Sequence, residues 1–159
     1  MKKSWHRVIL IAFVSAGFFC FKNSEFKPYP ISEYVIERQA YSLAYDGQRK
    51  QAKWVYEHLT ERNLEKNADR AKMDFKTDPD LPKLLQSTKG DYYKSGFDRG
   101  HLCPAADANF DEQALKETFY LSNISPQIPK FNRAVWGKLE RKSRFDLRSR
   151  SAAFFSTFS

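Results

Sequence analysis

The run Phe97-Asp98-Arg99-Gly100-His101-Leu102 lies near the middle of this 159-residue chain. A charged pair, Asp98 and Arg99, precedes a glycine, which lets the backbone pass close to another group or to a ligand. His101 follows at once, and a neutral imidazole with a pKa of about 6.5 accepts a proton from water at physiological pH. An imidazole beside a guanidinium suits phosphate chemistry, so His101 and Arg99 are the first candidate catalytic residues.

The other two histidines are weaker candidates. His6 lies in the N-terminal 21 residues that have the layout of an export signal, just before their apolar run. His58 alternates with Trp54 and Tyr56 on an expected strand, where a packed or surface imidazole is the expected role.

A second set of polar residues follows on an expected helix. Asn132 is suited to cap a helix in which Val135, Trp136 and Leu139 have helical apolar spacing. Asn132, Trp136 and Glu140 are four residues apart, so they share one face, with an amide and a carboxylate about two turns apart. Magnesium takes oxygen donors and needs only one or two protein groups. The alternative interpretation is a helix cap, a core tryptophan and a solvated glutamate.

The chain before the first motif predicts a β-hairpin and then irregular structure. Residues 34–59 alternate as strands around the turn Asp46-Gly47. Residues 67–93 contain several Pro and Gly positions with weak periodicity, which indicates a long surface excursion. A short strand is expected over residues 97–102.

Between the two motifs, Asp111 is expected to cap a helix over residues 112–117. A strand over 119–122 and a loop over 124–131, which contains two prolines, should follow. From Leu147 the composition changes to Ser, Arg, Ala and Phe without a clear period.

Three motifs occur in a characteristic order: Phe97 to Leu102, then Phe119-Tyr-Leu-Ser-Asn-Ile-Ser-Pro-Gln127, then Asn132 followed by Trp136, Leu139 and Glu140. From about Tyr41 to Arg144 the chain closely resembles the DNA/RNA non-specific endonuclease family. The resemblance implies an α+β chain with the ββα-metal nuclease fold and a mixed or antiparallel sheet. In that fold two antiparallel strands and a helix hold one divalent ion.

The resemblance also implies roles for individual residues. His101 matches the general base that activates the attacking water, and Asn132 matches the direct ligand of Mg²⁺ or Mn²⁺. Glu140 matches a carboxylate that holds metal-bound water. Arg99 matches an arginine near the scissile phosphate, and Arg70 resembles a further phosphate-stabilising arginine in a looser motif.

DNA and RNA are the implied partners, and a homodimer is compatible with the sequence. Arg99, Lys130, Arg133 and Lys138 are the candidate nucleic-acid-binding residues. The last three belong to a basic stretch over residues 130–150 with only two acidic residues, Glu140 and Asp146. Such a stretch suits either a surface that follows the phosphate backbone or a solvated helix face.

The N-terminal region has the layout of an export signal. Three basic residues precede the 14-residue, mostly apolar run Val8–Phe21, which is shorter than a membrane span. We expect a signal peptide, or an N-terminal anchor, over residues 1–22 and a linker over residues 23–33. A lipid anchor at Cys20 is a further alternative. We therefore expect export to the periplasm or the medium. Removal of the three basic residues of the signal changes the net charge of the chain from +8 to +5.

We expect the remaining residues, 34–159, to form a partial DNA/RNA non-specific endonuclease domain. Members of the family continue past the last helix into further strands, and the tail from Leu147 does not resemble that continuation, so the C-terminal part of the domain is missing. A truncated gene product and a natural short variant both fit. The alternatives to a nuclease are an inactive nucleic-acid-binding remnant and a membrane-anchored interaction protein.

Overall fold

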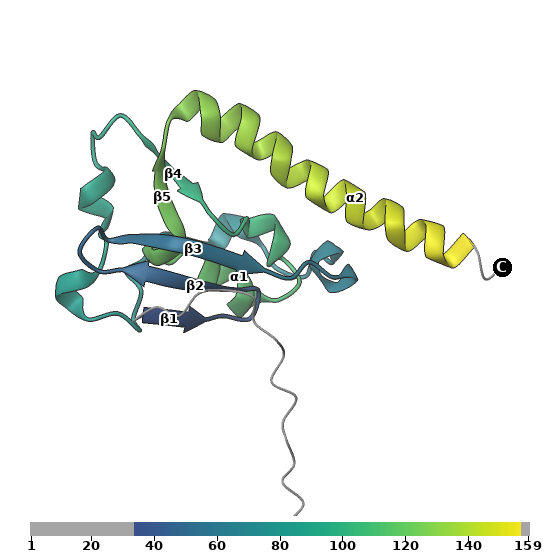
Figure 1. Cartoon of the computed structure of the whole chain (residues 1–159), viewed down its shortest axis with the longest axis horizontal. Coiled ribbons are helices and arrows are strands. Elements are labelled where there is room, and N and C mark those ends of the chain that lie inside the picture. The colour runs from purple at the N-terminus through teal and green to yellow at the C-terminus, as the bar shows by residue number, and fades with distance from the viewer. Residues whose placement is uncertain (1–33, 157–159) are drawn as a thin grey trace, which may run out of the picture.

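The computed structural model describes the backbone of residues 34–156 and the side chains of residues 34–149. The expected signal, linker and Cys20 lie outside the described residues. Within that part of the chain, no helix is long and apolar enough to cross a membrane. Short strands, single-turn helices and two α-helices alternate along the chain (Figure 1), which is an α+β arrangement.

The first sheet has three antiparallel strands in the order β1-β2-β3. These are β1 (Tyr34–Glu37), β2 (Tyr41–Asp46) and β3 (Gln51–Glu57). The hairpin expected over residues 34–59 is therefore confirmed as β2 and β3, and β1 adds a strand at the edge. Asp46 closes the turn, because its Oδ1 accepts hydrogen bonds from the backbone N–H groups of Gln48 and Arg49.

The core face of β3 carries a carboxylate. Leu43 pairs with Val55 and Tyr41 pairs with Glu57, and partners in register point to the same face of a sheet. Leu43 and Tyr41 are buried. Glu57 therefore enters the interior, whereas His58 at the end of the strand is exposed.

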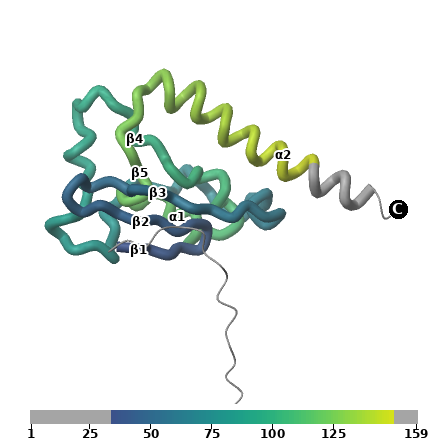
Figure 2. The backbone as a smooth tube through the Cα atoms, viewed as in Figure 1, coloured from purple at the N-terminus to yellow at the C-terminus, as the bar shows by residue number. Residues whose placement is uncertain are grey.

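The connection from β3 to β4 contains only single-turn 3-10 helices, which confirms the irregular excursion expected over residues 67–93. It leaves β3 at one end of the sheet and reaches β4 from the other end (Figure 2). Its helices are η1 (Glu61–Leu64), η2 (Arg70–Lys72), η3 (Lys83–Leu85) and η4 (Lys89–Tyr92).

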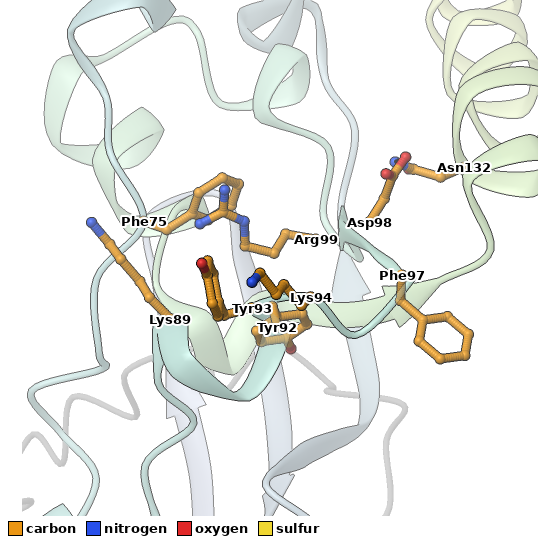
Figure 3. A pocket seen from close by; sticks show the side chains of 9 residues that line it. All are labelled: Phe75, Lys89, Tyr92, Tyr93, Lys94, Phe97, Asp98, Arg99 and Asn132. Atoms are coloured by element: carbon orange, nitrogen blue, oxygen red, sulfur yellow. Dashed lines mark hydrogen bonds between the residues drawn. The ribbon is translucent and has the colours of Figure 1, made fainter.

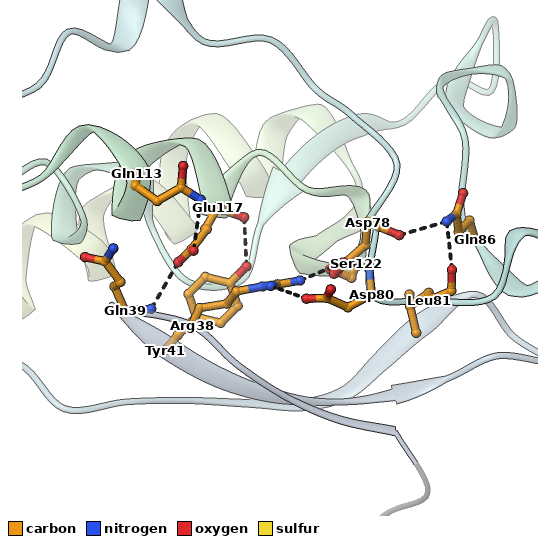
Figure 4. Close-up of polar contacts among 10 residues, drawn as sticks. All are labelled: Arg38, Gln39, Tyr41, Asp78, Asp80, Leu81, Gln86, Gln113, Glu117 and Ser122. Atoms are coloured by element: carbon orange, nitrogen blue, oxygen red, sulfur yellow. Dashed lines mark hydrogen bonds and ion pairs between the residues drawn. The ribbon is translucent and has the colours of Figure 1, made fainter.

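A buried polar network holds this connection against the sheet and α1 (Figure 4). Asp78 accepts a hydrogen bond from Arg38 Nη2 at 2.6 Å and another from the hydroxyl of Ser122. Tyr41 donates to the backbone oxygen of Glu117 at 2.8 Å. Because Asp78 is 1% exposed, its charge is compensated by these donors instead of by water.

Helix α1 (Glu112–Thr118) begins as predicted, with Asp111 as its N-cap. The side chain of Asp111 accepts from the backbone N–H of Ala114 at 2.9 Å. Ala114 and Leu115 are buried, so one face of α1 packs on the core. The main apolar cluster joins this helix to the first sheet; it contains Ile36, Ala40, Tyr41, Leu43, Tyr45, Leu81, Cys103, Ala108, Phe110 and Ala114.

The second sheet is an antiparallel pair, β4 (Asp98–His101) and β5 (Ile124–Gln127). Strand β4 confirms the strand expected over 97–102. The strand expected over 119–122 is wrong: this region holds η6 (Leu121–Asn123), and only Tyr120 forms a bridge, with Lys76. The loop expected over 124–131 is wrong as well, because β5 occupies its first half.

Pro126 explains why a loop was expected where β5 lies. A proline lacks an N–H group, which argues against a strand in the middle of a sheet but is tolerated at an edge. Pro126 pairs with Arg99 in a sheet of two strands, where both strands are edges.

The last described element is a long helix in two parts, η7 (Phe131–Trp136), which is a π-helix, and α2 (Gly137–Ser156). The expected N-cap at Asn132 is wrong: its backbone N–H already donates to the backbone oxygen of Ile128, and Lys130 already has helical backbone angles. The helix also continues from Leu147 to Ser156, where the sequence has no clear helical period. β4, β5 and this helix form the ββα unit that the resemblance implies.

Candidate active site

His101 ends β4 and lies among aromatic rings. Its side chain is 8% exposed. The Phe119 ring stands edge-on to the imidazole at 4.9 Å between centroids, and the Phe75 ring lies at 5.6 Å. These contacts restrict the imidazole to one orientation.

The imidazole of His101 is held neutral. Burial, and then the positive charge of Arg70, lower the pKa of His101 to about 3. Both causes act against the imidazolium form, since a low dielectric and a nearby cation disfavour a second positive charge. Its Nε2 is buried without a hydrogen-bond partner among the described residues. A neutral ring nitrogen can accept a proton, so the geometry fits a base.

Two arginines flank the same aromatic rings. The Arg99 guanidinium lies 4.4 Å from the centroid of Phe75, and the Arg70 guanidinium lies 5.8 Å from the centroid of Phe119. Figure 3 shows Arg99 lying along Phe75. The structure thus brings Arg70, from η2, to the same site as Arg99 and His101, although 29 residues separate Arg70 and Arg99 in the sequence. Two fixed cations beside a base suit an anionic substrate.

Asn132 faces β4 from the first turn of the helix. Its side-chain Nδ2 donates to Asp98 Oδ2 at 3.0 Å. Asp98 also accepts two hydrogen bonds from Arg133, at 2.7 and 2.8 Å. Because the amide nitrogen is engaged, the amide oxygen of Asn132 is oriented away from Asp98 and is available to a cation.

Glu140 lies two turns further along the helix. Asn132, Trp136 and Glu140 are each partly buried, whereas Arg133 and Val135 are exposed. The predicted common face is therefore confirmed. Burial raises the pKa of Glu140; the charge of Arg144 lowers it, that of Asp107 raises it and that of Arg70 lowers it. The influence of Arg70 relates Glu140 to the same site as His101.

The helix is joined to β4 by a further bond. The indole N–H of Trp136 donates to the backbone oxygen of His101 at 3.0 Å. The predicted core tryptophan is thus partly buried and directly bonded to the residue that carries the candidate base.

The oxygen donors present fit a sparsely ligated divalent ion. Among residues 34–149, no three His, Cys, Asp or Glu side chains gather in a way that would hold a metal. Asn132 supplies a neutral oxygen and Glu140 a carboxylate on the same helix face. Magnesium keeps most of its waters and needs few protein ligands, so this pair suffices when substrate phosphate completes the shell.

The predicted nucleic-acid-binding residues have different surroundings. Lys130 and Lys138 are exposed. Arg133 is 72% exposed but paired with Asp98. Lys142 pairs with Asp146, and the side chain of Arg144 is only 17% exposed, in an ion pair with Asp107. The basic stretch is therefore not one uniform surface, because acidic residues distant in sequence compensate part of it.

A buried polar network beneath the helix has no counterpart among the sequence predictions. Arg144 Nη1 contacts Asp107 Oδ1 at 2.7 Å, and the Cys103 thiol donates to Glu57 Oε2 at 3.3 Å. Burial, with the nearby charge of Asp107, raises the pKa of Glu57 to about 7. Burial also raises the pKa of Asp107. In the sequence, Glu57 lies on the strand face opposite Trp54, Tyr56 and His58, so the alternation did not indicate its burial; the register of β2 with β3 places it on the core side.

The ββα unit thus carries a buried, neutral histidine on its first strand and an asparagine on its helix. Comparison with known proteins agrees, because residues 23–152 match the DNA/RNA non-specific endonuclease family. The chain belongs to the DNA/RNA non-specific endonuclease family.

Individual relatives are similar over the same region. The chain is 47% identical over 108 residues to Nuclease C1 of Cunninghamella echinulata var. echinulata, covering 66% of this chain and 43% of that protein. It is 40% identical over 120 residues to human mitochondrial Endonuclease G, covering 76% of this chain and 40% of the relative.

A solved structure is similar as well. A chain of the EndoG/EndoGI complex superposes with a TM-score of 0.72 at 37% identity, over 76% of this chain and 50% of that chain. This chain therefore spans about half, or less, of the length of the proteins that it matches.

Proposed function

We propose that this chain is a divalent-metal-dependent, sequence-nonspecific endonuclease that hydrolyses phosphodiester bonds of DNA and RNA. The observation that carries the proposal is the environment of His101. Its imidazole is buried and neutral, two arginines from separate segments flank it, and the helix with Asn132 and Glu140 is bonded to its backbone.

His101 takes a proton from water, and the resulting nucleophile attacks phosphorus in line with the leaving oxygen. Phe75 and Phe119 hold the imidazole in place during this transfer. Arg99 and Arg70 bind the phosphate oxygens and stabilise the negative charge that grows on them. The bond between phosphorus and the leaving oxygen breaks, the leaving oxygen takes up a proton from solvent water, and His101 releases its proton to solvent.

A base with a pKa of about 3 in the free protein would be weak. A phosphodiester bound beside Arg70 and Arg99 places negative charge close to the imidazole. Because that charge favours the imidazolium form, the pKa of His101 rises when substrate binds. His101 therefore becomes a stronger base in the complex than in the free protein.

Asn132 would bind Mg²⁺ or Mn²⁺ directly, and Glu140 would hold a bound water. The bound ion would neutralise charge on the scissile phosphate and the leaving oxygen. Asp98 supports this arrangement because it engages the Asn132 amide nitrogen and orients the amide oxygen.

The proposed groups address the phosphate and not the edges of bases. Contacts to phosphate position a nucleic acid but carry no sequence information. His101, Arg99 and Arg70 therefore support cleavage without sequence specificity, and they do not discriminate deoxyribose from ribose.

A plasmid-nicking assay with magnesium tests the proposal. The chain, His101→Ala and His58→Ala are compared at equal concentration, His58 being the exposed histidine outside the site. Loss of general-base catalysis lowers the rate by roughly 10²- to 10⁴-fold, so only His101→Ala should fail to nick. Equal rates for all three proteins would remove His101 from the mechanism.

The second candidate is a nucleic-acid-binding remnant that does not cut. The chain spans half or less of the length of its relatives. On the helix that carries the proposed metal-site residues, the apolar side chains of Val135, Leu139 and Phe145 are 60%, 52% and 68% exposed. Absence of nicking together with salt-sensitive binding would favour this candidate.

The chain is also proposed to be exported. The basic residues and apolar run before Lys22 support this proposal. N-terminal sequencing of the protein recovered from the medium or periplasm should begin after the apolar run. Recovery of the intact chain with the membrane fraction would instead indicate an anchor.

A further inference from the structure

A cleft of about 490 Å³ opens beside the candidate active site. The side chains that line it are shown in Figure 3; they are Phe75, Lys89, Tyr92, Tyr93, Lys94, Phe97, Asp98, Arg99 and Asn132. Arg99 and Asn132 belong to the proposed catalytic machinery. The other side of the cleft comes from η4 and the turn after it, to which no role has been assigned so far.

The charge of this cleft is positive. Lys89, Lys94 and Arg99 line it, against the single carboxylate of Asp98. Asp98 is already engaged by Arg133 and Asn132. Lys89 pairs with Asp74, but both side chains are more than half exposed, so water and ions readily compete for that contact. The cleft is suited to the phosphates of a strand that extends beyond the scissile bond.

Two adjacent tyrosines at the cleft have different environments. Tyr92 is 8% exposed, and its hydroxyl donates to the backbone oxygen of Ile124 at 2.9 Å, so it belongs to the core. Tyr93 is 74% exposed. The Lys94 ammonium lies 5.3 Å from the centroid of its ring. The ring of Tyr93 stands in the cleft near Arg99 in Figure 3. Tyr93 therefore presents an accessible aromatic face next to cations.

We propose that this cleft binds unpaired nucleic-acid strands, with a base stacked on Tyr93 and the flanking phosphates on Lys89, Lys94 and Arg99. Aromatic side chains beside a cationic groove bind single strands because every base has a face that can stack. Within a duplex those faces are already covered by neighbouring bases. The inference deepens the proposed function, on which it rests, by naming single strands as the preferred substrate class.

The turn that follows Tyr93 supports a defined placement of its ring. Lys94 and Gly96 have φ angles of 52° and 81°, in the left-handed region. The Ser95 hydroxyl donates to the backbone oxygen of Tyr92 and accepts from the backbone N–H of Phe97. These bonds hold the backbone of the turn that carries Tyr93, while Lys94 lies over the Tyr93 ring.

Binding is measured without catalysis, in EDTA, by fluorescence anisotropy of a labelled 12-nucleotide strand and of the matching duplex. The chain is compared with Tyr93→Ala, with Tyr93→Phe, which keeps the ring, and with Leu84→Ala, which removes an 89% exposed side chain outside the cleft. Loss of one stacked base weakens binding by roughly 5- to 150-fold. Only Tyr93→Ala should lose affinity, and only for the single strand.

A strand carrying 2-aminopurine supplies a signature of stacking. Its fluorescence should be quenched when it binds the chain or Tyr93→Phe, and not when it binds Tyr93→Ala. Unchanged strand affinity in Tyr93→Ala would overturn the inference. An equal loss for strand and duplex would also overturn it, because the ring would then not be reading unpaired bases.

The same proteins in the nicking assay separate this inference from the proposed function. If the chain nicks plasmid but Tyr93→Ala binds strands normally, only the stacking inference fails. If the chain binds strands through Tyr93 but never nicks, the proposed function fails and the stacking inference stands.

Discussion

The amide nitrogen of Asn132 and the carboxylate of Asp98 are 3.0 Å apart, and this bond orients the oxygen of the proposed metal ligand. Asp98 comes from the motif that carries His101, and Asn132 comes from the helix. The strand and the helix of the ββα unit are therefore coupled by Asp98, the first residue of β4, and Asn132 in the first turn of η7.

Removing the Asp98 carboxylate should weaken metal binding. Asp98→Ala frees the Asn132 amide to rotate, and loss of a group that orients a ligand lowers metal affinity by roughly 10- to 100-fold. Mn²⁺ binding followed by electron paramagnetic resonance measures this without any activity. Arg133→Ala is the matched control, since it removes the exposed ion pair but keeps the bond to Asn132. Equal affinity of Asp98→Ala and Arg133→Ala would contradict the assigned role of Asp98.

Breaking the buried ion pair of Arg144 should destabilise the fold strongly. Asp107 is 1% exposed, and Arg144→Met leaves its charge unpaired, at a cost of about 3–5 kcal/mol. Urea unfolding measures the change. The double variant Arg144→Met with Asp107→Asn should recover much of the loss, because no buried charge remains. Arg148→Met, at an exposed position of the same helix, should change little, and a loss as large as that of Arg144→Met would refute the prediction.

Glu57 should make the protein less stable as the pH rises. Its pKa is about 7 in the folded protein against 4.5 for an ordinary glutamate, so between these values the folded state binds a proton that the unfolded state has released. Stability from this group is present below pH 4.5 and is lost as the pH rises through 7. Glu57→Gln should therefore gain stability relative to the parent chain with rising pH, by up to about 1.4 kcal/mol per pH unit.

His101 should have the opposite effect to Glu57 on how stability depends on pH, over an overlapping pH range. Its pKa falls from 6.5 to about 3 on folding, so the unfolded chain binds the extra proton as the pH drops below 6.5. His101→Asn should therefore lose less stability on acidification than the parent chain. Urea unfolding at pH 5, 6 and 7 compares both variants with the parent. For each variant, the difference in free energy of unfolding from the parent is followed with pH. This difference should rise with pH for Glu57→Gln and fall with pH for His101→Asn. A change in the same direction for both variants would contradict this assignment.

Trp136→Phe should loosen the contact between helix and strand while keeping an aromatic ring. It removes the N–H that donates to the His101 carbonyl, which lowers the free energy of unfolding by about 0.5–1.5 kcal/mol. Phe131→Leu, at the ring 5.9 Å from Trp136, removes packing but leaves that hydrogen bond. Hydrogen exchange near His101 should increase in Trp136→Phe only, and an equal increase in both variants would assign the effect to packing.

Local rules predicted most elements of the fold. The alternation at Tyr41, Leu43 and Tyr45, the cap at Asp111 and the strand around Arg99 each depend on neighbours in sequence, and the structure confirms them. The sequence did not predict β5, which contains Pro126. A strand tolerates proline when it has a neighbouring strand on one side only, as β5 does. That is a property of the sheet and not of the segment.

The sequence by itself determined the family, the residues that carry the proposed chemistry, and the common helix face of Asn132, Trp136 and Glu140. These follow from motif order and from helical spacing, which are properties of the chain. Only the tertiary structure decided that His101 is buried and neutral, that Arg70 joins Arg99 beside it, and that Asp107 compensates Arg144. Burial and charge pairing arise between segments distant in sequence, and a pKa depends on what those segments place around the group.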